Sequence, residues 1–125
     1  MFFSNSMIYD GSIKEDLFIR GVVAFNNQDF YDAHEYWEEI WSDYKLSDPD
    51  IIQGMIQVSV GYFHFNNSNP KGAIGLFSKS IKKLTPYMNS DILRVDIKRI
   101  IENSHDCIER IDNGLKIKKI TINLI

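Results

Sequence analysis

Apolar residues recur at helical spacing over most of the chain, and polar turn signals separate the segments that carry them. The pattern predicts five helices, which cover about residues 13–26, 30–44, 49–65, a segment from Asn69-Pro70 to just before Pro86, and a segment from Ser90-Asp91 to Asn113-Gly114. The third segment is apolar on most sides, which indicates a central position in the fold. The sequence therefore predicts an all-α protein of about five helices.

The segments outside the predicted helices are short. We expect residues 1–11 to form an N-terminal arm and residues 115–125 to form a C-terminal tail. Apolar and polar residues alternate in this tail around Lys118-Lys119, which is consistent with an extended segment docked on the helices or with a short strand. No linker is long enough to separate domains, so residues 1–125 are expected to form a single helical domain.

The predicted helices contain an internal repeat with an offset of 40 residues. Five residues recur identically and a sixth position stays aromatic: Gly21, Phe25, Asn26, Asn27, Ala33 and Trp37 correspond to Gly61, Phe65, Asn66, Asn67, Ala73 and Phe77. In each copy the small residues allow two helices to approach closely, and the aromatic residue fills the space beside them. We therefore expect two antiparallel helical hairpins of one design, followed by a C-terminal helix.

This order of small, small and aromatic residues resembles a tetratricopeptide hairpin. The period differs, because that family repeats about every 34 residues, and two units are fewer than the roughly three that a solenoid needs. The resemblance thus implies tetratricopeptide-like packing and does not predict a peptide-binding groove.

Composition and charge narrow the range of functions. The chain is 44% hydrophobic and 25% charged, which is typical of a soluble globular protein. Its net charge of −3 provides no overall attraction to nucleic acid or to an anionic membrane, and no apolar run approaches the length of a membrane span. The N-terminus lacks the pattern of a signal peptide. We expect a cytoplasmic protein, or a plastid protein if an organelle genome encodes it.

The second predicted helix carries the most unusual side chains. Four of them, His34, Trp37, Glu38 and Trp41, lie on or beside one face of this helix at 100° per residue. Because His34 and Glu38 are four residues apart, the carboxylate can orient the imidazole, or both groups can ligate a metal ion. A structural pair that ties the second helix to the third is the interpretation we favour.

The third predicted helix carries a polar stripe formed by Gln53, Gln57 and His64. A buried amide without a partner costs roughly 1–3 kcal/mol, so these residues need polar neighbours. We expect the second and third helices to face each other across His34, Glu38 and Gln57, in one buried polar cluster. If a metal ion were bound there, its ligands would be His34, Glu38 and His64, although no metal motif is present.

These residues also carry a resemblance to a known family. The matching text is Phe25-Asn26, Asp29 to Glu35, Trp37-Glu38, Trp41, Gln53 to Gln57, and Asn69-x-x-Gly72-Ala73 ahead of Leu84. Over roughly residues 15–85 the chain is similar to the domain of unknown function 309 family, which is small and all-helical. The resemblance implies a multi-helical bundle and a shared site at His34, Glu38, Trp41, Gln53 and Gln57, and it implies no activity.

Two functions follow from these observations. The first is a non-catalytic interaction or scaffold protein, without a cofactor, that binds an unidentified protein partner or associates with itself. It predicts that His34→Ala lowers stability by about 1–3 kcal/mol through an unpaired buried partner. The alternative is a small metal-dependent or acid–base, hydrolase-like enzyme in which His34 and Glu38 are the catalytic groups.

Overall fold

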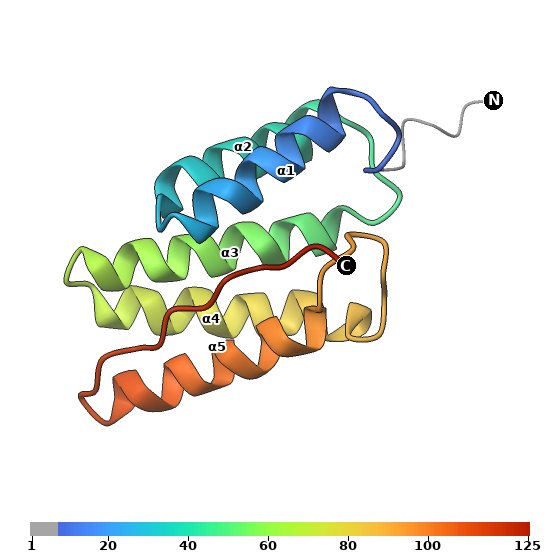
Figure 1. The fold of residues 1–125 in the computed structure, drawn as a ribbon. Coiled ribbons are helices and arrows are strands. Elements are labelled where there is room, and N and C mark those ends of the chain that lie inside the picture. Colours follow the sequence, from blue (N-terminus) through green and yellow to red (C-terminus); the bar gives the residue numbers. More distant parts are fainter. Residues whose placement is uncertain (1–7) are drawn as a thin grey trace.

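A computed structural model describes residues 8–125 as a layered arrangement of helices (Figure 1). The helices are α1 (Ile13–Asn26), α2 (Phe30–Asp43), α3 (Pro49–Asn66), α4 (Pro70–Leu84), the short 3₁₀ helix η2 (Thr85–Tyr87) and α5 (Ile97–Asp112). Helices α1 and α2 form one antiparallel hairpin, α3 and α4 form the second, and α5 packs on α4. Residues 8–125 contain no strand, so the all-α prediction is confirmed. The predicted arm over residues 1–11 lies mostly outside the described residues.

The repeat of two hairpins is visible in the packing. Each hairpin buries a glycine, an alanine and an aromatic residue in matching positions: Gly21, Ala33 and Trp37 in the first, and Gly61, Ala73 and Phe77 in the second. The Cβ that Gly61 lacks would lie 3.0 Å from Phe77 Cε1, and the Cβ that Gly21 lacks would overlap the Trp37 indole. Each glycine therefore makes room for the aromatic ring of its own hairpin.

The turns of the two hairpins also repeat. Gln28 and Ser68 both adopt the left-handed backbone conformation, with φ of 65° and 60°. Their N–H groups donate to the carbonyl oxygens of Phe25 and Phe65, at 2.9 and 3.1 Å. Neither residue is glycine, although residues other than glycine rarely adopt this conformation. The same turn is thus built twice from different side chains.

The start of the fifth helix differs from the prediction. The helix begins at Ile97 and not at Ser90-Asp91. Asp96 is its N-cap and accepts a hydrogen bond from an N–H group of the first turn at 3.1 Å. Ahead of it, Arg94 has a φ of 55°, which interrupts a helix, and Leu93 is buried with its carbonyl bound to another segment. Tertiary contacts of this short segment therefore override its helical pattern.

A charged pair is buried at the start of α1. Lys14 Nζ lies 3.0 Å from Asp10 Oδ2, and the Ser12 N–H donates to Asp10 Oδ1 at 2.9 Å. Hydrogen bonds from Ser12, followed by the interaction with Lys14, lower the pKa of Asp10 from 3.8 to about 2. The ionised form of Asp10 is therefore stabilised by folding.

This pair predicts an acid dependence of stability. Because the pKa of Asp10 is depressed in the folded state, its contribution is fully present above pH 3.8 and is lost as the pH falls towards about 2. We expect Asp10→Asn to be less stable than the wild type at pH 5, with a difference that shrinks by pH 2.5. Urea unfolding at both pH values measures it. A difference of equal size at the two values would contradict the assignment.

Candidate functional site

The predicted pair of His34 and Glu38 is present but is not buried. His34 Nε2 lies 3.8 Å from Glu38 Oε2, and the exposed fractions of the two side chains are 22% and 50%. His34 Nδ1 lies 2.9 Å from the carbonyl oxygen of Tyr31, within the same helix. The inner face of α2 is formed by other residues, among them Trp37 and Ile40. The expectation of a buried cluster is therefore wrong for His34 and Glu38, which flank the packed face.

The two tryptophans have different environments. Trp37 is fully buried, and its Nε1–H donates to the carbonyl oxygen of Phe18 at 3.1 Å. Trp41 is 39% exposed, because Ile40 fills the buried position in the last turn of α2. The prediction that both share an inner face is wrong for Trp41. Trp37 is a packing anchor, and Trp41 is a surface residue.

The polar stripe of α3 does not join the His34–Glu38 pair. Gln57 is buried with no hydrogen-bond partner for Oε1, while Gln53 and His64 are half-buried. Within residues 8–125, no three His, Cys, Asp or Glu side chains are placed to hold a metal ion, so His34, Glu38 and His64 do not form the alternative metal site. The predicted polar network across α2 and α3 is thus not formed.

His34 is consequently expected to contribute little to stability. It is partly exposed and its close hydrogen bond is to the backbone of its own helix. We expect His34→Ala to change the free energy of unfolding by about 0.5 kcal/mol or less, as for most surface positions. Urea unfolding checks this value. A loss above 1 kcal/mol would restore the structural role that the sequence predicted.

A different site lies beneath the C-terminal tail, residues 115–125. The tail is extended, which agrees with the first of the two predicted alternatives, and it runs back antiparallel to α5 (Figure 1). Its first part lies near Arg110, its middle near Arg99 and its end near Arg94. We call the surface beneath it the tail groove, formed by Asn26 of α1, Tyr62 of α3, Arg99 of α5 and Arg94.

The tail groove binds the main chain of the tail. The Asn26 side chain makes two bonds to one residue: Oδ1 accepts from the Ile122 N–H at 2.7 Å, and Nδ2 donates to the Ile122 carbonyl at 2.9 Å. The Tyr62 hydroxyl donates to the Lys118 carbonyl at 2.8 Å. Arg99 Nη1 donates to the Thr121 carbonyl at 2.7 Å. All of these contacts are to backbone groups, which every extended polypeptide carries.

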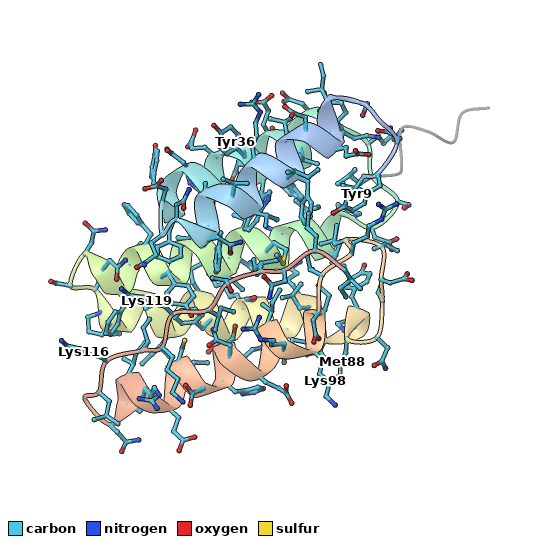
Figure 2. All side chains as sticks on the ribbon, in the orientation of Figure 1. Tyr9, Tyr36, Met88, Lys98, Lys116 and Lys119 are labelled. Atoms are coloured by element: carbon cyan, nitrogen blue, oxygen red, sulfur yellow. The ribbon has the colours of Figure 1, made fainter. Side chains whose placement is uncertain are left out.

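Side chains of the tail provide the apolar part of the contact. Ile122 is 4% exposed and belongs to the core, and Ile117 and Ile120 are half-buried against it. Lys116 and Lys119, labelled in Figure 2, are exposed. The docked tail therefore buries Ile122, half-buries Ile117 and Ile120, and leaves its lysines and Ile125 in solvent.

Tyr62 connects the tail to the interior. Its hydroxyl accepts a hydrogen bond from Asn103 Nδ2 at 2.8 Å and lies 3.7 Å from Cys107 Sγ. Burial raises the pKa of Tyr62 well above its ordinary value, and burial also raises the pKa of Cys107 to about 11. Both groups are protonated near neutral pH, so the tyrosine hydroxyl remains a hydrogen-bond donor to the tail.

Unfilled space adjoins the tail along its length. A cavity of about 510 Å³ lies at its end, between Ile8, Leu46, Ile51, Ile92 and Ile125. Cavities of about 240 and 210 Å³ lie beside Ile122 and beside Ile117. The tail therefore occupies the tail groove without filling it.

The hairpins that form one side of this groove are also the part of the chain that matches a known family. Residues 18–76 match the family described as "Domain of unknown function (DUF309)". The resemblance to DUF309 is confirmed over this stretch. No curated protein matches the chain. The DUF309 stretch contains Asn26 and Tyr62, whereas α5 and the tail lie outside it.

None of the helices within residues 8–125 combines the length and the apolar character needed to cross a bilayer.

Proposed function

We propose that this DUF309-like protein is a non-catalytic interaction domain that binds extended polypeptide segments in the tail groove. The two-bond contact between the Asn26 amide and the backbone of Ile122 is the observation that carries this proposal. A side-chain amide paired with both the N–H and the C=O of one residue holds that residue in an extended conformation. It does so whatever the side chain of that residue is.

The hydrolase-like alternative has weaker support. Its proposed base, Glu38, is half-exposed, and its proposed metal ligands are not assembled within the described residues. General acid–base groups are usually placed in clefts where burial perturbs their pKa. The tail groove, by contrast, combines buried apolar surface with oriented hydrogen-bonding groups, as polypeptide-binding surfaces do.

A peptide-binding measurement tests the proposed function. The probe is a fluorescent synthetic peptide of residues 115–125, and the protein is the full chain with Ile122→Asp, which weakens the docking of its own tail. We expect saturable binding that Asn26→Ala weakens by about tenfold or more, because two hydrogen bonds are lost. Asn27→Ala is the matched control, since this exposed neighbouring asparagine lines none of the cavities beside the tail. Absence of binding, or equal effects of the two alanine variants, would overturn the proposal.

A further inference from the structure

Resting on the proposed function, we infer that the C-terminal tail is an intramolecular competitor for the tail groove. The partner that displaces it is a segment of another protein that is extended, carries aliphatic side chains at the spacing of Ile117, Ile120 and Ile122, and has a neutral or basic net charge. The docked tail serves as the template for this partner, because the structure shows which of its groups the groove contacts.

The apolar requirement follows from the burial of the tail. Ile122 is almost completely buried, and Ile117 and Ile120 pack against the core from half-buried positions. An aliphatic side chain at each of these positions would preserve the same contacts. The exposed residues between them, among them Lys118, make no salt bridge within residues 8–125, so their identity matters less.

A preference for a neutral or basic partner follows from the distribution of ionisable residues. The tail contains three of the 14 Lys and Arg residues and none of the 17 Asp and Glu residues, so residues 1–114 carry a net charge of −6. This net charge favours the approach of a neutral or basic segment over that of a strongly acidic one. Single acidic side chains are tolerated, because the groove itself contains Arg94 and Arg99. The three lysines of the tail fit this preference.

The tail can be displaced because, beyond the turn that joins it to α5, only non-covalent contacts hold it in the groove. Gly114, in the left-handed conformation with φ of 69°, ends α5, and the tail leaves the helix there. The cavities beside Ile122 and at the tail's end leave space that a bulkier segment can fill. The tail has the advantage of tethering, which gives short linkers effective concentrations of about millimolar. A free segment must therefore compete with a bound tail.

The competition predicts a difference between two full-length proteins. We expect the fluorescent peptide of residues 115–125 to bind the Ile122→Asp protein at least tenfold more tightly than the wild type, because the wild-type tail occupies the groove. In the peptide, Ile122→Asp is expected to abolish binding. Replacing Lys118 and Lys119 of the peptide by glutamine is expected to change the affinity by less than threefold.

The outcomes separate the two proposals. If the peptide binds the wild type and the Ile122→Asp protein equally tightly, the competition is overturned and the proposed function is left intact. If the peptide binds neither protein, both proposals are overturned. The aliphatic requirement would be overturned if peptides with serine in place of the isoleucines bound with unchanged affinity. Light scattering of the wild type provides a further test: a dimer that Ile122→Asp dissociates would identify a second copy of this chain as the occupant and overturn the inference of a separate partner.

Discussion

Gly21→Ala is expected to lower the free energy of unfolding by about 3 kcal/mol, at the upper end of typical overpacking costs. The added methyl group would overlap the Trp37 indole, which is fully buried. The indole cannot shift freely, because its Nε1–H is bound to the Phe18 carbonyl and its ring lies about 6 Å from the Phe18 and Phe25 rings. Urea unfolding followed by tryptophan fluorescence measures the effect.

Gly75→Ala is the matched control for this prediction. Gly75 lies within α4, and an added Cβ would meet no atom within 4 Å. Alanine is favoured over glycine in a helix interior by roughly 0.5–1 kcal/mol, so this variant is expected to be slightly more stable than the wild type. If Gly21→Ala were as stable as Gly75→Ala, the close packing of the first hairpin would be wrong.

The second large effect is expected for Ile122→Asp, which should detach the tail. The substitution removes a buried isoleucine, whose burial contributes about 1.5–3 kcal/mol, and places a carboxylate in its position. We expect a loss of stability of about 2 kcal/mol. We also expect trypsin to cleave after Lys118 and Lys119 at least tenfold faster, as measured by mass spectrometry over time.

Leu124→Asp provides the comparison within the same segment. Leu124 is 42% exposed, two residues from Ile122. We expect this variant to retain nearly the stability and the tryptic cleavage rate of the wild type. Equal cleavage rates for the two aspartate variants would show that the tail is not held through Ile122.

The hairpins were predictable because their determinants are local and repeated. Gly21 and Trp37, like Gly61 and Phe77, are 16 residues apart in the chain and meet within one hairpin. The start of α5 was not predictable in the same way. Leu93 fits a helical stripe, but its carbonyl is bound by the Tyr9 hydroxyl, 84 residues away in sequence. Contacts of this kind leave no local pattern.

The site was only partly predictable for a related reason. Helical spacing correctly predicted that His34 and Glu38 lie close together, and the distance between His34 Nε2 and Glu38 Oε2 is 3.8 Å. The spacing could not show how much of the surface of α2 the neighbouring helices cover. The same limit applied to Trp41. Asn26 was recognised as a repeat residue, yet its role in the tail groove depends on a segment that the repeat does not include. The sequence predicted tetratricopeptide-like packing without a peptide-binding groove because the period and the number of repeats differ from that family. The contacts of the tail were not predictable because its partners are distant in sequence.

The separation between Asn26 and Ile122 also has a consequence for the order of folding. The two residues are 96 positions apart, so their contact closes one of the longest loops in the chain. The hairpins, whose contacts are local, can form well before this loop closes. At about 5–20 residues per second, a ribosome needs roughly 5–20 seconds to extend the chain from Asn26 to Ile122. Arg94 and Arg99 of the tail groove are themselves made only 28 and 23 residues before Ile122. The groove and the tail are therefore completed almost together, and a segment encountered during translation meets no complete groove before the tail itself is made.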